Sequence, residues 1–399
     1  MGRRVLPAIL AVITVLGGLE KSVAQDAFKV SFRVASYNAA LSRDTEGALI
    51  EALHSGNDPQ ARAIAEVIQA VQPDILLINE LDWDPDGAAA SLFHDSYLAV
   101  GDAGIEYPFM VVPPVNTGIA SGFDLNRDGE TGGAADAWGW GRYPGHYGFA
   151  IYSRFPIETA AIRSFQTLPW AAMPEALLLK GGDGALSGAD GYYADEVAAL
   201  FPLSSKTHLD VPVLIDRTVV HILASHPTPP IFDGPEDRNG KRNHDEIRLW
   251  ADYIDGADWI TDDAGRSGGL ALGARFVIVG DLNADPFDGD STGGAVRQLL
   301  DHPLIFGSAT DGALIPMGEG SLDQPNEITG HQGDPRFDTA DFTRSPGNLR
   351  VDYVLPSTAG LVWVDGGVVW PRNGAPLAEA VKASDHRLVW VDLELAPLQ

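Results

Sequence analysis

Residues 280–286, Gly-Asp-Leu-Asn-Ala-Asp-Pro, carry the strongest chemical signal in the chain, because they follow directly on an apolar run at 276–279. In an extended chain, side chains two positions apart point the same way, so Asp281 and Asn283 would present a carboxylate and an amide to one spot. A carboxylate can polarise an attacking water or bind a divalent cation, and an amide can donate to a phosphate oxygen. The pair therefore indicates phosphoryl chemistry, although Asp, Asn and Pro also form ordinary turns after strands.

Two further apolar runs end on polar side chains. The run at 75–78 leads into Asn79 and Glu80, and the first apolar stretch beyond residue 30 ends on Asn38. An acid at the end of a buried strand can hardly stay unpaired, and Glu80 is a suitable ligand for a hard cation such as Mg²⁺ or Ca²⁺. Each of these residues also fits a polar strand end without any function.

Two histidines stand at positions suited to proton transfer. His226 lies in Ser-His-Pro-Thr-Pro-Pro, where three prolines stiffen the loop, and His386 follows Asp385 just before the last apolar run. A histidine that removes a proton from water needs an acid behind it to fix its tautomer, and Asp352 is the candidate partner of His386. A structural histidine held by hydrogen bonds would have the same local sequence.

Residues 237–248 form the densest basic patch of the chain. Arg242 or Arg248 could hold a phosphate or a carboxylate through a bidentate contact. The alternative is the first turn of a helix, with ordinary surface ion pairs and Asn243 as its cap. His146 is a similar weak candidate for substrate binding.

A segment near the middle of the chain resembles the start of a calcium-binding loop. Asp124, Asn126 and Asp128 place oxygens at alternate positions, and Gly129 is the sixth residue, as such a loop requires. Ala135 occupies the twelfth position, where Glu is expected. A structural Ca²⁺ site and a simple polar turn both remain as interpretations.

The composition excludes several classes of protein. The 399 residues include 27 basic and 55 acidic side chains, for a formal net charge of −28, and 45% are apolar, which suffices for a large core. The absence of cysteine excludes disulfides, a thiol nucleophile and an iron–sulfur cluster, so a metal must be held by oxygen and imidazole. The negative charge also disfavours tight binding of a long nucleic acid.

The first residues are typical of a secretory signal peptide. Arg3 and Arg4 precede an apolar run at 5–16, and small residues follow, with cleavage expected after Ala24. The run is shorter than the roughly 20 apolar residues of a membrane anchor, which is the alternative. We therefore expect a secreted or periplasmic protein without stable membrane insertion.

The rest of the chain, residues 25–399, is expected to form a single α+β domain, since no repeat or linker divides it. Strand-length apolar runs and a few segments of helical periodicity favour two packed sheets with outer helices. The expected strands cover residues 32–38, 75–78, 149–152, 208–215, 218–225 (turning at 216–217), 275–279, 350–355, 361–370 and 388–395, the expected helices cover 60–71 and 243–260, and insertions are expected near 101–147, 180–200 and 307–348.

In their order along the chain, these motifs resemble the endonuclease/exonuclease/phosphatase superfamily, which has the deoxyribonuclease-I-like fold. The resemblance rests on Ser-Tyr-Asn at 36–38, Asn-Glu at 79–80, the run from Gly148 to Ile157, Ala-Ser-His at 224–226, residues 280–286, Val-Asp-Tyr-Val-Leu at 351–355 and Ser-Asp-His at 384–386. It implies a four-layer α/β/β/α sandwich of two mixed sheets with outer helices.

The resemblance also implies roles for individual residues. Glu80 is similar to the principal metal ligand of the family, with Asn38 and Asp385 close to the ion, which would be Mg²⁺ or Mn²⁺. Asp281 resembles the acid that orients or activates the attacking water, and Asn283 resembles the amide that holds the phosphate.

The histidines have counterparts as well. His386, paired with Asp352, resembles the base or phosphate-stabilising histidine, and His226 resembles the residue that protonates the leaving oxygen. An in-line attack by water without a covalent enzyme intermediate is expected.

Two functional hypotheses follow. The first is a secreted, divalent-metal-dependent phosphoester hydrolase, a phosphodiesterase, nuclease or phosphatase acting on small molecules, lipid headgroups or nucleic acid. The second is a non-catalytic calcium-binding extracellular module on the same fold, which the acidic charge and the partial calcium loop would suit.

Overall fold

The computed structural model describes residues 30–179, 191–306, 314–325, 330–343 and 345–396. The expected signal peptide and parts of the expected insertions near 180–200 and 307–348 lie outside these residues. Within them, no helix is both long enough and apolar enough to cross a membrane.

The first sheet has six strands in the order β12-β13-β1-β2-β4-β3. Its central strand β1 runs parallel to β2 and antiparallel to β13, so the sheet is mixed. The strands are β1 (Ser31–Asn38), β2 (Ile75–Asn79), β3 (Phe109–Val111), β4 (Phe149–Ser153), β12 (Leu361–Val368) and β13 (Val389–Leu395). Each predicted strand in this set is present, with ends that differ by at most two residues.

The second sheet has five strands in the order β11-β8-β7-β6-β5. Asp216 and Arg217, both with positive φ of 42° and 67°, turn the hairpin between β6 and β7, as predicted. The strands are β5 (Arg163–Ser164), β6 (Leu209–Ile215), β7 (Thr218–Ala224), β8 (Arg275–Asp281) and β11 (Asp352–Pro356), and a separate pair is formed by β9 (Ala340–Asp341) and β10 (Asn348–Leu349).

Helices flank the two sheets. The α-helices are α1 (Ala48–His54), α2 (Pro59–Val71), α3 (Ala88–Phe93), α4 (Asp195–Leu200), α5 (Arg238–Ile254) and α6 (Arg297–Leu300). Shorter helical turns are η1 (His94–Leu98), η2 (Ala134–Asp136), η3 (Thr159–Ala161), η4 (Trp170–Ala172), η5 (Thr292–Gly294), η7 (Gly320–Asp323), η8 (Pro335–Phe337) and η9 (Ala380–Ala383).

Helix α2 matches its prediction, because Asp58 caps it and Pro59 occupies the first helical position. The prediction for α5 is wrong at both ends. The helix begins at Arg238, so Asn243 lies inside it and is not its cap. It ends at Ile254, where Gly256 follows with a φ of 78° that continues no helix.

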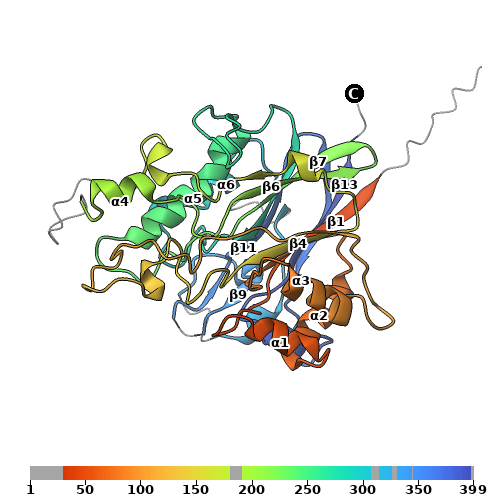
Figure 1. The fold of residues 1–399 in the computed structure, drawn as a ribbon. Helices are drawn as coiled ribbons and strands as arrows, with labels where there is room; N and C mark the ends of the chain where they lie inside the picture. Colours follow the sequence, from red (N-terminus) through yellow and green to blue (C-terminus); the bar gives the residue numbers. More distant parts are fainter. Residues whose placement is uncertain (1–29, 180–190, 307–313, 326–329, 344, 397–399) are drawn as a thin grey trace, which may run out of the picture.

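Three hydrophobic cores separate four layers, which confirms the predicted α/β/β/α sandwich. Alternation along β1 sends Val34 between the two sheets, whereas Ala35 and Tyr37 face α1, α2 and α3. On the other side, Ile278 of β8 packs with α5 and α6, whereas Val279 faces the first sheet. Figure 1 shows α1–α3 and α5–α6 on opposite sides of the strands.

Strand ends from both sheets meet at one edge of the sandwich. The register pairs Asn38 of β1 with Asn79 of β2, and Asp281 of β8 with Asp352 of β11. Gly280 permits the close approach of β7, because a Cβ there would lie 2.1 Å from the carbonyl oxygen of Ser225. The sheet packing therefore brings polar residues from four distant sequence segments together.

Candidate active site

Asp281 lies at the centre of this edge, at the end of β8. Its Oδ2 accepts a hydrogen bond from Asn38 Nδ2 at 3.0 Å and lies 3.3 Å from His226 Nε2. Its Oδ1 accepts from the backbone N–H of Asn283 at 2.9 Å. Burial opposes the charge of Asp281, but His386 and His226 outweigh it and hold its pKa below the usual range. The carboxylate is therefore ionised at neutral pH.

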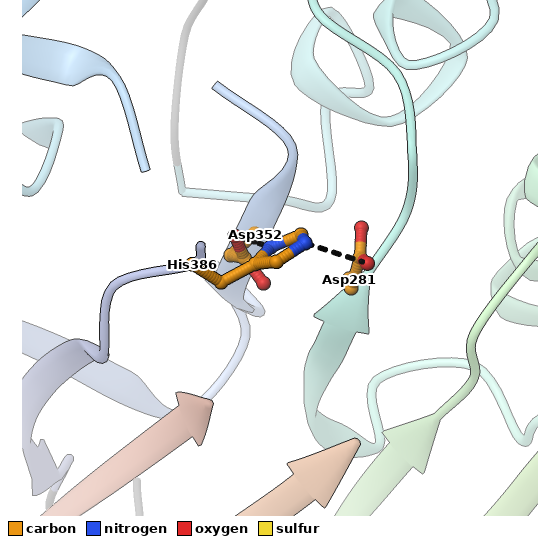
Figure 2. Close-up of side chains that lie close together, drawn as sticks. All are labelled: Asp281, Asp352 and His386. Atoms are coloured by element: carbon orange, nitrogen blue, oxygen red, sulfur yellow. Dashed lines mark hydrogen bonds and ion pairs between the residues drawn. The ribbon is translucent and has the colours of Figure 1, made fainter. Parts of the chain in front are cut away.

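His386 stands between two carboxylates (Figure 2). Its Nδ1 lies 2.8 Å from Asp352 Oδ2, and its Nε2 lies 3.7 Å from Asp281 Oδ2. Burial disfavours the charged ring, but Asp352 and Asp281 more than offset it and raise the pKa of His386 to about 10. The structure thus brings Asp352 to the ring nitrogen of His386, the contact that the sequence suggested, and the two acids favour the charged form of the ring.

His226 has the opposite electrostatics. Burial, followed by the positive charge of Lys206, lowers the pKa of His226 to about 4. Its Nδ1 is buried and has no hydrogen-bond partner. The ring is therefore uncharged at neutral pH, and its Nε2 faces the same carboxylate oxygen that His386 approaches.

Glu80 is the residue best placed to hold a cation. It lies at the end of β2 with a left-handed φ of 57°, and burial raises the pKa of its carboxyl to about 6. Asp385 and Asp281 line the same cavity and add negative charge around it. A half-buried carboxylate among other acids fits a hard divalent ion, which would offset their repulsion.

Asn38 is oriented as a brace. Its Nδ2 donates to Glu80 Oε1 at 3.1 Å and to Asp281, and its Oδ1 accepts from the backbone N–H of Ala40 at 3.1 Å. In this orientation the amide fixes two carboxylates, and its oxygen keeps one lone pair beyond the bond from Ala40, so its contact to an ion stays a prediction.

A second group of metal-ligating types consists of Asp281, Asp352 and His386, whose ligand atoms lie within 4.8 Å of one another. The two acids favour the charged form of His386 when no metal is bound, and a cation at this cluster would compete with that proton. The three residues are therefore a second candidate site for a cation beside Glu80, and they are also suited to handle a proton.

Lys206 is a functional candidate that sequence reasoning missed. Its side chain lines the cavity and is 6% exposed, and its Nζ makes a single long contact, 3.5 Å, to the carbonyl oxygen of Pro227. Burial lowers the pKa of Lys206, whereas the nearby Glu246, Glu80 and Asp281 favour its charge. The only sequence signal is a lone base in the polar stretch Ser-Ser-Lys-Thr before β6.

Glu246 fixes the backbone around this lysine. From inside α5, its two carboxylate oxygens accept from the backbone N–H groups of Ser205 and Thr228, both at 2.6 Å. The segments that carry Lys206 and His226 are therefore tied to one buried side chain.

Most of the side chains described above line one cavity of about 930 Å³, whereas Asn38, Asp352 and Glu246 lie behind its wall. The ionisable and amide side chains of its lining that could take part in the chemistry are Glu80, Lys206, His226, Asp281, Asn283, Asp385 and His386. Tyr147, which sequence reasoning also missed, lines it from a left-handed position with a φ of 57°. Asn283 Nδ2 donates to Pro227 at 3.1 Å, so this amide also braces the His226 loop.

The weaker sequence candidates separate into two groups. Arg242 lines the cavity, but its guanidinium donates to the carbonyls of Leu203 and Pro202, both at 3.0 Å. Asn243 is buried, and its amide donates to the carbonyls of Thr228 and Leu282. Both residues therefore support loops of the site.

Arg248 and His146 stand apart from the cavity lining. Arg248 donates to the carbonyl of Pro174 and pairs with Asp252 at 3.4 Å. The His146 ring is buried against Tyr147, with ring centroids 3.7 Å apart. Neither arrangement leaves the side chain directed at a substrate.

The calcium-like loop is closed on itself. Asp124 accepts from the backbone N–H groups of Asp128 and Gly129, and Asn126 Nδ2 donates to Asp128 Oδ2 at 2.8 Å. Residue 135 supplies no carboxylate, and the neighbouring Asp136 accepts from Leu125 N–H instead. Structural Ca²⁺ at this loop stays a prediction.

One family model matches most of the chain. The family model described as the Endonuclease/Exonuclease/phosphatase family matches residues 35–386. A search of curated proteins found no match.

Solved structures of similar proteins include an endonuclease/exonuclease/phosphatase from Beutenbergia cavernae, at 18% identity over 92% of this chain and 72% of that chain, with a TM-score of 0.49. Sphingomyelinase C from Streptomyces griseocarneus is 17% identical over 92% of this chain and 100% of that one, with a TM-score of 0.44. A beta toxin from Staphylococcus aureus with bound magnesium ions is 13% identical over 92% of this chain and 100% of that one, with a TM-score of 0.44.

Proposed function

The chain belongs to the endonuclease/exonuclease/phosphatase family, whose members are metal-dependent phosphoric ester hydrolases, and on that premise we propose that it is a secreted phosphodiesterase of small substrates. The proposal rests on the groups that surround the side chain of Asp281. One ionised, buried carboxylate lies within 3.7 Å of two histidine nitrogens and is fixed by Asn38 and Asn283. Such a carboxylate is suited to accept a hydrogen bond from a water and to orient it for attack.

The remaining groups are suited to hold the phosphate. The positive ring of His386 and the ammonium of Lys206 can neutralise non-bridging oxygens, and the amide of Asn283 borders the same cavity. A divalent cation at Glu80 would polarise the phosphoryl group and offset its charge. Because the free His226 ring is uncharged, we assign it a hydrogen bond from Nε2 to the departing oxygen.

Two features support a small diester. The cavity of about 930 Å³ is lined by residues 285–291 and by residues between 193 and 206 as well as by Asp281, and its volume is enough for a phosphate with organic groups. The net charge of −28 disfavours a long nucleic acid, whose phosphates it would repel.

Secretion is supported by the amino-terminal sequence, with two arginines, an apolar run and the cleavage site after Ala24. Mass spectrometry of the protein exported by a bacterial host tests it. A mature chain that begins at Gln25 is the expected result, and a retained chain that begins at Met1 would contradict it.

The experiment on activity compares bis-p-nitrophenyl phosphate with p-nitrophenyl phosphate, with Mg²⁺, Mn²⁺ or Ca²⁺ or with chelator, for the wild type and Asp281→Asn. We expect cleavage of the diester that needs metal and that Asp281→Asn lowers by about 10³-fold or more. The exposed Asp95→Asn serves as the matched control.

Preference for the monoester would favour a phosphatase instead. If metal ions raised the melting temperature while neither ester was cleaved, the non-catalytic calcium-binding module would replace the proposal.

A further inference from the structure

One side of the cavity is apolar, although the protein as a whole is strongly acidic. We call this part the apolar lobe, and its members are Leu125, Ala135, Ala137, Tyr193, Phe201 and Ile231. Most of these residues come from the insertions that we expected near 101–147 and 180–200.

The residues of the lobe are held in place by a hydrogen bond and by packing. Asp136 accepts from the backbone N–H of Leu125 at 2.7 Å and so holds the two ends of the 125–136 loop together. The rings of Tyr193 and Phe201 lie 4.9 Å apart, and both residues are less than 9% exposed. The wall is therefore packed into the core that covers α5.

Cationic groups beside the lobe are already engaged. Arg242 donates to two carbonyls and lies 4.7 Å from the Phe201 ring, and Arg238 pairs with Glu236. An anionic group in the lobe would therefore find neither of these two arginines free to pair with it. An uncharged group would bury apolar surface without a desolvation cost.

The lobe joins the catalytic centre where the phosphate is proposed to bind. Lys206 and His226 line the same cavity, and Ile231 follows His226 by five residues along the proline-stiffened loop. A phosphate near Lys206 and His226 would therefore place one of its ester groups beside the lobe.

Two exposed aromatic side chains mark the entrance. Phe232 is 82% exposed and Trp140 is 50% exposed, and both line the cavity. Large exposed apolar side chains next to a cavity are typical of a surface that meets an apolar ligand.

We propose that the apolar lobe binds an uncharged aliphatic or aromatic group of the phosphoester substrate. The proposal rests on the phosphoesterase function proposed above and names its substrate class: an ester of phosphate with an apolar alcohol or phenol. The cavity of about 930 Å³ lies within the range of small-molecule sites.

The test measures binding of product-like ligands to the magnesium-loaded protein by calorimetry. Methyl-, hexyl- and phenylphosphonate share one anionic head and differ only in the apolar group. We expect hexyl- and phenylphosphonate to bind at least about tenfold more tightly than methylphosphonate, as burial of their added apolar surface implies.

Two pairs of variants locate the effect. Ala135→Phe fills the lobe, and Ala134→Phe adds the same side chain at a neighbour outside the cavity lining. Phe232→Ser removes the exposed aromatic ring, and Leu272→Ser is its control, since both wild-type residues are 82% exposed.

The preference is the affinity for hexylphosphonate divided by the affinity for methylphosphonate. We expect Ala135→Phe to reduce this ratio to less than about threefold and Phe232→Ser to lower it by about threefold. Both control variants should keep the ratio of the wild type. Equal binding of methyl- and hexylphosphonate by the wild type would overturn the proposal. An unchanged preference in both Phe232→Ser and Ala135→Phe would overturn it as well. If Ala135→Phe fails to fold, the result for Phe232→Ser alone decides whether the proposal stands.

The phosphonate measurement separates the two proposals. A preference for apolar groups without cleavage of any ester would refute the phosphodiesterase function and leave the lobe as a binding site. Cleavage without any such preference would refute the lobe alone.

Discussion

The two sides of the cavity are built in different ways. The catalytic side consists of strand ends of β1, β2, β8 and β11, where buried polar groups hold one another by hydrogen bonds of 2.8 to 3.1 Å. The lobe side consists of irregular insertions with apolar side chains. We therefore propose that the sheets fix the chemistry, whereas the insertions set which organic group is accepted.

The largest effect on the metal requirement should come from loss of the metal ligand on the catalytic side. Glu80→Gln keeps the hydrogen bond from Asn38 but removes the charge, so we expect half-maximal activity to require about 100-fold more Mg²⁺. The measurement is a Mg²⁺ titration of diester cleavage, with the exposed Glu51→Gln as control. An unchanged Mg²⁺ requirement would place the metal elsewhere.

The next effect concerns the coupled pair His386 and Asp352. We expect His386→Gln to lower kcat by about 10²-fold to 10³-fold, since the charged ring faces Asp281. Asp352→Asn acts only through that ring, so the double variant should be little worse than His386→Gln alone. Fully additive losses would show that Asp352 has a separate role.

A smaller effect is expected where the two sides meet, at Lys206. Lys206→Met keeps most of the side-chain volume but removes the ammonium, and we expect KM to rise about tenfold while kcat changes less. Steady-state kinetics over a range of diester concentrations measures the two constants separately. A loss confined to kcat would mean that Lys206 does not hold the ground-state phosphate.

The smallest effect on the chemistry should come from the brace between the two sides. Glu246→Gln leaves one of two buried N–H groups, those of Ser205 and Thr228, without its acceptor, which should cost about 1–3 kcal/mol of unfolding free energy. Thermal unfolding measures it, with the exposed Glu196→Gln as control. Equal melting temperatures for the two variants would refute the role of the brace.

The regular parts of the catalytic side could be predicted from the sequence for a physical reason. Strands such as β2 and β8 are buried on both faces, so they are continuous apolar runs, and their ends are marked by Glu80 and Asp281. The hairpin turn at 216–217 followed from the same pattern of two apolar runs.

The rest depended on contacts that no local pattern encodes. The pairing of Asp352 with Asp281 across β11 and β8 is a matter of register, and only the contact of Asp352 with His386 was predicted from the sequence. Helix α5 begins with polar residues that are buried, among them Asn243 and Glu246, so a search for an apolar stripe placed its start too late.

Lys206 was not predicted, because it is a functional candidate only through its burial beside the cavity, and its neighbours in the sequence do not indicate that burial. The lobe was not predicted either, because its members are separated by up to 106 residues and meet only through irregular segments. The catalytic roles of the individual side chains stay predictions.

We propose that a water oriented by Asp281 attacks phosphorus directly. The most direct test is the stereochemistry at phosphorus when a chiral phosphorothioate diester is hydrolysed in ¹⁸O-labelled water. A single in-line displacement predicts inversion of configuration, with ¹⁸O in the phosphorothioate product. Retention would require an intermediate bound covalently to the enzyme and would contradict the account.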